Sequence, residues 1–337
     1  MEEKDYSTDP EWADITPIPL DDGSNSGAAP LATIAYPPEY LELTSYLRAV
    51  MAANEMSERA LKLTQDVISM NPAHYTVWIY RARILFALEK DLSEELEWLN
   101  QVSLKYLKNY QIWGHRQALM SSRTHFPELS AKEPDFLMEM LAQDAKNYHV
   151  WTYRHWLVRH YRLWDSPREL EDVEALIKAD VRNNSAWNHR YMLRFGPREN
   201  EPDGGMVNAG KAQTTPAEKG VQSVVDEDVV DLELRYTQEQ ILRAPENRSP
   251  WWYARGVIHA ANRKLGEWEG FVSQFVSADG NSVKSSHAVE WLADVYAETG
   301  GHNAKAADML TLLKEKYDPI RKNYWDYRIR QLDVVSA

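Results

Sequence analysis

The chain has 337 residues, 44% of them hydrophobic, so it can bury a sizeable core, and its formal net charge of −13 disfavours a nonspecific grip on nucleic acid. It has no cysteine, which excludes disulfides and thiolate metal ligands within the chain. No apolar run is long enough for stable membrane insertion and the start is unlike a signal peptide, so we expect a cytoplasmic protein.

Residues 1–35 are rich in Pro, Gly, Ser and Asp, and eight carboxylates against one lysine in residues 1–30 give a local charge of −7. This composition predicts a mostly flexible acidic tail. Within the tail, EWADITPIP at 11–19 carries Trp12, Ile15 and Ile18. We expect this docking segment to bind either a partner or the folded body.

Residues 36–332 contain a repeated segment, which predicts one helical-hairpin repeat domain followed by a short tail at 333–337. The four clearest copies each contain an anchor tryptophan, and these tryptophans follow one another at spacings of 35, 38 and 36 residues. A period in this range is typical of stacked helical hairpins. The copies are AHYTVWIYRARIL at 73–85, KNYQIWGHRQAL at 108–119, KNYHVWTYRHWL at 146–157 and NNSAWNHRYML at 183–193.

The segments between these copies read as the partner helices of the hairpins. Leu92, Leu96 and Leu99 recur at helical spacing on one face, with Asp91 placed as an N-cap. The segment SPRE at 166–169 supplies a cap serine, a first-turn proline and a capping-box acid. Because no stretch alternates between apolar and polar residues, we expect an all-α fold without a sheet.

Further anchor tryptophans follow at Trp251, Trp291 and Trp325, after a gap of 64 residues from the fourth copy. The Gly-, Pro- and Asn-rich stretch at about 196–225 explains the gap as a loop insertion. The last units depart from the pattern, which is expected of the end of a solenoid.

Within each copy, Trp and Arg three residues apart share one helical face, and a structural role between hairpins is the simpler interpretation. Asn109, Asn147 and Asn183 precede the helix and suit N-caps. The structural repeat motif comprises Trp78, Trp113, Arg116, Trp151, Arg154, Trp187 and Arg190.

Lys108 and Lys146 differ, because a lysine before a helix start is poorly placed for the helix dipole. Either these lysines are simply solvated, or an anion such as phosphate binds there with backbone N–H groups. Tyr110 and Tyr148 follow them, and the next position varies between Gln111 and His149, which suggests ligand-specific work at that position. The chain shows no phosphate loop, nucleophile motif or metal-ligand cluster, so no complete catalytic site and no metal ligand is expected from it.

Taken together, these segments resemble the α subunit shared by protein farnesyltransferase and protein geranylgeranyltransferase type I, from about residue 11 to residue 332. The segments that carry the resemblance are EWADITPIP, NEMSERALKLTQDVISMNPAHYTVW, KNYQIW, KNYHVW, DVRNNSAWNHRY and IRKNYWDYR. The resemblance implies a right-handed superhelix, a crescent of antiparallel hairpins, that wraps around a β subunit.

The same resemblance implies the chemistry. The β subunit of either enzyme holds the catalytic zinc, and a farnesyl or geranylgeranyl group passes from its diphosphate to the cysteine of a C-terminal CaaX motif, forming a thioether. Magnesium is expected to support diphosphate departure in the farnesyl enzyme. Substrates of the kind implied are Ras and Rho GTPases.

The family's functional residues carry over onto the two KNY turns. Lys108 matches the lysine that contacts the diphosphate, Tyr110 a tyrosine lining the same cleft, and Gln111 the glutamine that binds the CaaX carboxylate. Residues close to the diphosphate correspond to Asn147, Tyr148 and His149. Lys108, Tyr148 and His149 are the expected catalytic groups, because fixed cations and donors stabilise a departing diphosphate.

Two alternatives remain open at this point. One is the α subunit of the Rab-specific geranylgeranyltransferase, which often carries extra domains for which this chain has no room. The other is a helical-repeat scaffold without catalysis, although the Trp-x-x-Arg spacing lacks the tetratricopeptide pattern.

Overall fold

The computed structural model describes residues 6–20, 32, 34–198, 226–277, 280–299 and 301–334. Within these residues the secondary structure is helical, apart from one isolated antiparallel bridge between Val276 and Val283. The prediction of an all-α fold is confirmed. The chain divides into two compact units, Met1–Tyr161 and Arg162–Ala337.

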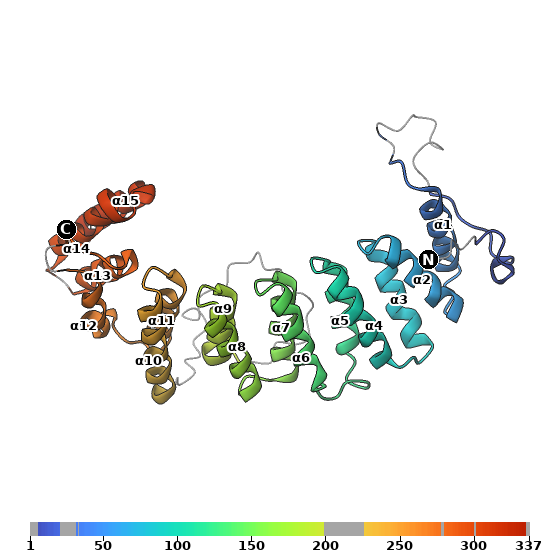
Figure 1. Ribbon diagram of the computed structural model, residues 1–337, viewed down its shortest axis with the longest axis horizontal. Coiled ribbons are helices and arrows are strands. Elements are labelled where there is room, and N and C mark those ends of the chain that lie inside the picture. Colours follow the sequence, from blue (N-terminus) through green and yellow to red (C-terminus); the bar gives the residue numbers. More distant parts are fainter. Residues whose placement is uncertain are drawn as a thin grey trace. The chain divides into compact units, whose positions relative to one another are not determined.

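The first unit is a two-layer stack of helical hairpins (Figure 1). The second helices of successive hairpins, α3, α5 and α7, contact one another, and the first helices α4 and α6 do the same. The helices are α1 (Pro38–Ala52), α2 (Glu58–Met70), α3 (Tyr75–Ala87), α4 (Leu92–Lys105), α5 (Tyr110–Met120), α6 (Lys132–Gln143) and α7 (Tyr148–Tyr161).

The second unit continues the hairpin pattern and then departs from it. The regular pairs α8 with α9 and α10 with α11 are followed by short 3₁₀ segments, by the one-turn helix α12, and by α13, α14 and α15, which pack in series. The helices are α8 (Pro167–Ala179), α9 (Asn184–Phe195), α10 (Glu227–Arg243), α11 (Arg248–Ala260), α12 (Glu269–Val272), α13 (Ser286–Glu298), α14 (Asn303–Leu312) and α15 (Lys322–Val334).

Four-residue turns of one kind close the regular hairpins in the described residues. In each turn the first residue caps the helix that ends, and the fourth residue caps the helix that begins. The backbone N–H of the fourth residue donates to the carbonyl of the first, at 2.9 to 3.1 Å. The turns are 71–74, 106–109, 144–147, 180–183 and 244–247.

The carbonyl of the second turn residue ties each hairpin to the next. At Pro72 it accepts a hydrogen bond from Trp78 Nε1 of its own hairpin and another from Asn109 Nδ2 of the following one, both at 2.9 Å. The Val181 carbonyl is shared in the same way by Trp187 and Asn247. The repeated Trp and Asn therefore serve packing and capping, in agreement with their structural interpretation.

A buried link of three side chains, here called the Arg–Glu–ring link, joins consecutive hairpins at mid-height. In the second link of the first unit, Arg116 makes two hydrogen bonds to the Glu133 carboxylate, at 2.7 and 2.5 Å, and Tyr153 donates to it at 2.8 Å. Arg116 and Glu133 are 1% and 3% exposed. The guanidinium also lies 4.3 Å from the ring centroid of Phe136, one helical turn after the glutamate.

The same link recurs at two other places among the described residues. In the first unit Glu95 is held by Arg81 and by His115, and in the second unit Glu233 is held by Arg190 and by Tyr253. Burial raises the pKa of Glu95, whereas hydrogen bonds and charges from His115 and Arg81 lower it. The net effect is a pKa below the ordinary value. Burial lowers the pKa of His115, so the neutral ring donates its N–H to the carboxylate.

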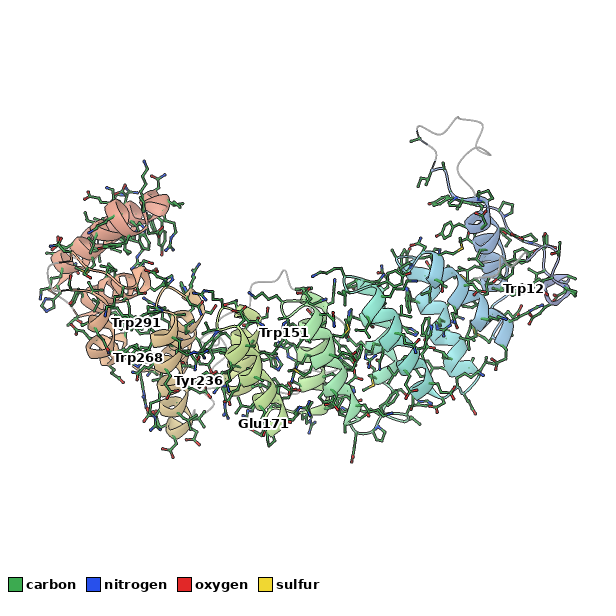
Figure 2. The ribbon with its side chains drawn as sticks, in the orientation of Figure 1. Trp12, Trp151, Glu171, Tyr236, Trp268 and Trp291 are labelled. Carbon is green, nitrogen blue, oxygen red and sulfur yellow. The ribbon has the colours of Figure 1, made fainter. Side chains whose placement is uncertain are left out.

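The ion pairing differs near the end of the second unit. Asp294 stands three residues after Trp291, where the regular copies have arginine, and it pairs with Arg255 at 2.5 Å and with Arg328. Trp291 stacks on Trp268 with ring centroids 5.3 Å apart (Figure 2). The last units therefore depart from the pattern, as expected: an acid stands where the regular copies have arginine after Trp291, although Arg328 keeps the regular position after Trp325.

The docking segment lies on the body of the first unit rather than free of it. Residues 6–20 pack on α1 and α2, and Trp12 is 2% exposed, with its ring edge-on to Tyr46 at 5.6 Å (Figure 2). Arg59 of α2 holds Asp14 through two hydrogen bonds of 2.7 and 2.9 Å. Residues 1–5, 21–31 and 33 of the acidic tail lie outside the described residues, as does the insertion from 199 to 225.

One cap differs from its prediction. Ser166 does precede α8, but its side chain makes no capping hydrogen bond. Glu169, predicted to complete a capping box, is 3% exposed and contacts His189 at 2.9 Å instead. A buried carboxylate requires a partner, and this requirement overrides the local capping pattern. No helix in the described part of the chain is both long and apolar enough to cross a membrane.

Substituting Glu133 tests the Arg–Glu–ring link. Glu133→Gln leaves the Arg116 charge buried without its counterion, and we expect the free energy of unfolding to fall by about 3–5 kcal/mol. Urea denaturation followed by circular dichroism measures this change. Glu139→Gln, at an exposed position on the same helix, should change stability by less than about 0.5 kcal/mol. Equal changes in the free energy of unfolding for the two substitutions would show that the buried link stabilises the fold no more than an exposed glutamate does.

Candidate functional site

The two KNY turns of the first unit bring four of the predicted site residues together at one end of α5 and α7, which contact each other. The Lys108 side chain is 74% exposed, and Tyr110 and Tyr148 are 49% and 59% exposed. The ring of His149 lies between the two tyrosines, edge-on to Tyr110 at 6.0 Å and to Tyr148 at 5.7 Å.

The tryptophans and arginines of the same segments are buried. Trp113 and Trp151 are each 4% exposed, and Arg116 and Arg154 are 1% and 0% exposed. The helix period separates the two sets, because residues one and two of the first turn face outward while Trp and Arg face the neighbouring hairpin. The segment therefore has a structural half and an accessible half, and only the accessible half can meet a ligand.

Asn147, which was predicted among the diphosphate contacts, belongs to the buried half, with 0% exposure. Its Oδ1 accepts from the backbone N–H groups of His149 and Val150 at 3.0 and 3.4 Å, and its Nδ2 donates to the Leu107 carbonyl at 2.8 Å. In this structure its side chain caps α7 and anchors the preceding turn. The cap also occupies two backbone donors that the anion-binding interpretation had assigned to a phosphate.

Lys108 forms an ion pair that sequence reasoning did not foresee. Its ammonium donates to Oδ2 of Asp144, the first residue of the next turn. This hydrogen bond, opposed by burial, lowers the pKa of the Asp144 carboxyl. The sequence carried only a faint signal, an acid three residues before a capping asparagine, because the pairing depends on how two side chains 36 residues apart, on different turns, come to face each other.

His149 is set up as a neutral donor. Partial burial lowers its pKa from the ordinary value of 6.5, and the positive charge of Lys108 lowers it further, while a hydrogen bond to the Lys108 backbone raises it. At neutral pH the imidazole is therefore uncharged, and its single N–H, which the Lys108 backbone accepts in this structure, would exchange that acceptor for a ligand in order to donate to it. An arriving anion would reverse part of this shift.

Gln111 lies at the edge of the cluster in the first turn of α5. Its Nε2 donates to the Ala73 carbonyl at 3.4 Å, which is a long and weak hydrogen bond. The amide can therefore exchange this contact for a better acceptor at little cost. The equivalent position in α3 is Thr76, so the polar type at this position differs between hairpins.

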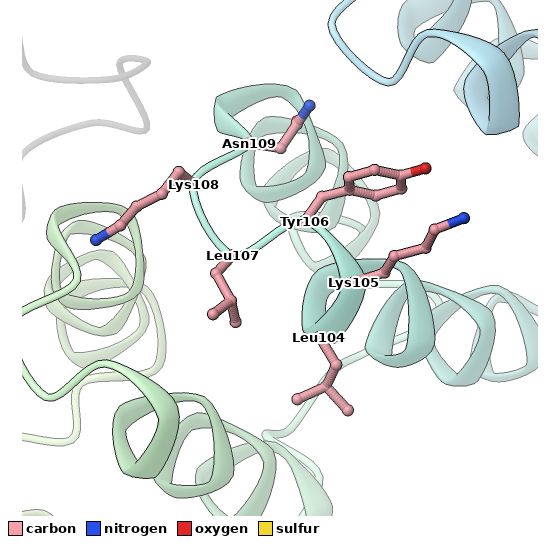
Figure 3. A pocket seen from close by; sticks show the side chains of 6 residues that line it. All are labelled: Leu104, Lys105, Tyr106, Leu107, Lys108 and Asn109. Atoms are coloured by element: carbon pink, nitrogen blue, oxygen red, sulfur yellow. The ribbon is translucent and has the colours of Figure 1, made fainter.

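An open hollow adjoins the Lys108 turn (Figure 3), in which the Lys108 side chain runs away from Lys105 and Tyr106. The lining residues are Leu104, Lys105, Tyr106, Leu107, Lys108 and Asn109. Among the described residues, no group of three or more His, Asp or Glu side chains is placed to hold a metal ion. The arrangement supplies a cation, two phenols and a neutral imidazole, but no nucleophile.

Comparison with known proteins gives the family. The protein prenyltransferase α subunit repeat matches residues 57–88, 92–123, 130–161 and 166–194. The protein farnesyltransferase/geranylgeranyltransferase type-1 subunit α of Candida albicans is 35% identical over 96% of this chain and 98% of its own length. The chain belongs to the protein farnesyltransferase/geranylgeranyltransferase type-1 α-subunit family.

Further matches agree with this assignment. The subunit of the same name from Dictyostelium discoideum is 31% identical over 96% of this chain and 92% of its own length. A solved structure, Candida albicans protein geranylgeranyltransferase-I complexed with GGPP, matches with a TM-score of 0.82 and 34% identity over 96% of this chain and 99% of the matched chain. As an α subunit of a heterodimeric prenyltransferase family, the chain is part of an enzyme and not a scaffold without catalysis.

The electrostatic coupling between Lys108 and His149 can be measured directly in this α subunit. In Lys108→Ala, loss of the positive charge favours the imidazolium, so the pKa of His149 should rise toward its ordinary value of 6.5. Titration of the imidazole signals by NMR, in the full chain, provides the test. Lys132→Ala, which removes an exposed lysine at the other end of α6, should leave the pKa unchanged. A fall in the pKa of His149 in Lys108→Ala would contradict the coupling.

Proposed function

We propose that this chain is the α half of a heterodimeric, zinc-dependent protein prenyltransferase. With one β subunit it would transfer a farnesyl group, and with another a geranylgeranyl group, from the isoprenoid diphosphate to the cysteine of a C-terminal CaaX motif. The observation that carries the proposal is the exposed cluster of Lys108, Tyr110, Tyr148 and His149 in a member of this α-subunit family.

The chemistry of the cluster suits a leaving diphosphate. Negative charge grows on the diphosphate as its bond to the prenyl carbon breaks, and preorganised cations and hydrogen-bond donors lower the barrier to that step. Lys108 would supply the cation, while the Tyr148 hydroxyl and the neutral His149 ring would donate hydrogen bonds. Tyr110 would line the same cleft, and its edge-on contact with His149 would hold the imidazole in place.

The remaining predicted residues have distinct parts. Gln111, whose amide is weakly held, would exchange the Ala73 carbonyl for the terminal carboxylate of the CaaX substrate. Asn147 would act through its cap, because its buried amide fixes the first turn of α7 on which Tyr148 and His149 stand. The repeat residues Trp113, Arg116, Trp151 and Arg154 would keep the two turns in register.

The zinc of such an enzyme does not fit the described residues of this chain. The chain has no cysteine, and no cluster of other ligating side chains is present among the residues described. We therefore assign the zinc to the β subunit and derive no step from it here. Magnesium, if it acts in the farnesyl enzyme, would likewise act on the diphosphate without a ligand set from this chain.

The partners follow from this proposal. They are the β subunits of protein farnesyltransferase and of geranylgeranyltransferase type I, the two prenyl diphosphates, and CaaX proteins such as Ras and Rho GTPases, met in the cytoplasm. The matched Candida albicans geranylgeranyltransferase-I is itself a complex with GGPP, which supports a prenyl diphosphate as ligand of the assembly.

Activity should depend on the partner. The purified chain alone should bind no zinc and transfer no prenyl group, because it supplies donors and cations but no metal site. Co-expressed with a β subunit, it should transfer a farnesyl or geranylgeranyl group to CaaX peptides, with the choice of prenyl group following β. Transfer by the chain alone would refute the shared-site proposal.

Lys108→Ala should leave the heterodimer intact and raise the barrier to transfer by on the order of 1–3 kcal/mol, as expected for one lost charge-stabilising group. The single-turnover rate at saturating prenyl diphosphate measures this change, and size-exclusion chromatography checks assembly. Lys132→Ala serves as the matched control, since it also removes an exposed lysine. An unchanged single-turnover rate in Lys108→Ala would exclude a role for this lysine in the reaction.

A further inference from the structure

Asp144 carries a carboxylate that its turn does not require. The corresponding first residue is Tyr106 in the preceding turn of the array and Ala244 in the last regular one, and both turns close with the same backbone hydrogen bond, at 2.9 Å. In all three turns the first residue donates its N–H to a carbonyl four residues earlier. The turn therefore folds without an acid, although Asn71 and Asp180 hold the same position in two other turns and, like Asp144, accept from the backbone N–H two residues on. What Asp144 adds to this local role is its hydrogen bond with Lys108.

The position of this carboxylate is also electrostatically costly. Asp144 follows the last residue of α6, where the helix dipole is negative and disfavours an anion. Even so, the hydrogen bond from Lys108 outweighs burial and holds the pKa of Asp144 below its usual range. The Lys108 ammonium and the Lys146 backbone N–H thus both favour the ionised carboxylate, and the side chains of Lys108 and Asp144 act as a pair.

The Lys108–Asp144 ion pair is the second interaction between the turns 106–109 and 144–147, after the hydrogen bond from Asn147. Asn147 Nδ2 holds the Leu107 carbonyl at 2.8 Å, which fixes the backbone just before Lys108. Asp144 Oδ1 accepts from the Lys146 backbone N–H at 3.2 Å, which orients the carboxylate, and Oδ2 receives the Lys108 ammonium. Backbone and ammonium of Lys108 are therefore both held by the turn 144–147.

Without the ion pair to Asp144, the Lys108 side chain would be poorly ordered. Its four-carbon stem has many rotamers, and the Lys108 side chain is 74% exposed, so little packing restrains it. An ion pair with that much solvent access is weak, so the ammonium can turn from the carboxylate to a more highly charged anion. The Asp144 carboxylate is only 25% exposed and keeps its hydrogen bond to the Lys146 N–H, so it does not move with the ammonium.

We propose that Asp144 is a positioning residue that holds the Lys108 ammonium at the site before the diphosphate arrives. The inference rests on the proposed function, because it assigns Lys108 to the leaving diphosphate. Asp144 touches neither substrate in this scheme and acts only through Lys108.

A double-mutant cycle tests this dependence. Single-turnover transfer to a CaaX peptide is measured for the heterodimer with wild-type chain, Asp144→Asn, Lys108→Ala and the double substitution. Asparagine keeps an oxygen for the Lys146 N–H and loses the charge. We expect Asp144→Asn to slow transfer about threefold to tenfold in the wild-type background and to have no further effect in Lys108→Ala.

Two further variants exclude a general disturbance of the fold. Asp180→Asn changes the same turn position in α8–α9, where the carboxylate accepts from the Arg182 backbone N–H at 2.8 Å, and its rate should stay within about twofold of wild type. Asp144→Glu keeps the charge and should retain more activity than Asp144→Asn. Assembly of each heterodimer is checked by size-exclusion chromatography.

The outcomes separate the two proposals. Equal slowing by Asp144→Asn in both backgrounds, or no slowing in either, overturns the positioning role and leaves the proposed function standing. A wild-type heterodimer that transfers no prenyl group defeats the proposed function, and the inference about Asp144 falls with it.

Discussion

The buried Arg–Glu–ring link is the interaction on which the rest of this structure depends. A carboxylate such as Glu133 can be buried only with partners, and its two partners, Arg116 and Tyr153, come from the hairpin before and from its own hairpin. The hairpins α4–α5, α6–α7 and α10–α11 therefore each need an arginine from the hairpin before to pair their buried glutamate. The link sets the register between neighbours within each unit, and the shared turn carbonyls, such as that of Pro72, set it again at the turn end.

The register between hairpins also brings the candidate site residues of two successive copies together. Because every regular turn has the same length and the same caps, the first helical residues of α5 and α7 emerge side by side, facing the same way. The framework residues are nearly constant, while the accessible residues vary between Gln111, His149 and Thr76. Ligand groups placed on a rigid, repeated frame keep their geometry without a large supporting structure of their own.

The division of labour in the proposed enzyme also follows from composition. A chain without cysteine, and without a ligand cluster among its described residues, offers cations and hydrogen-bond donors but no metal site. Such groups serve a leaving group better than a nucleophile. The α-subunit family to which the chain belongs is heterodimeric, and in the proposed enzyme the cluster at Lys108 and His149 would form one half of a shared site.

The sequence by itself determined the period, the all-α class, the anchor tryptophans, the capping asparagines and the split of the KNY segments into framework and accessible residues. These features depend on local spacing, which a linear pattern records directly. Only the tertiary structure decided the acid of each link, since Glu95, Glu133 and Glu233 stand 14, 17 and 43 residues after their arginines. Connections of unequal length hide such pairs in the sequence. The Lys108–Asp144 pair, the buried state of Asn147 and the docking of Trp12 on α1 were decided in the same way, because each depends on which surfaces meet after the hairpins have packed.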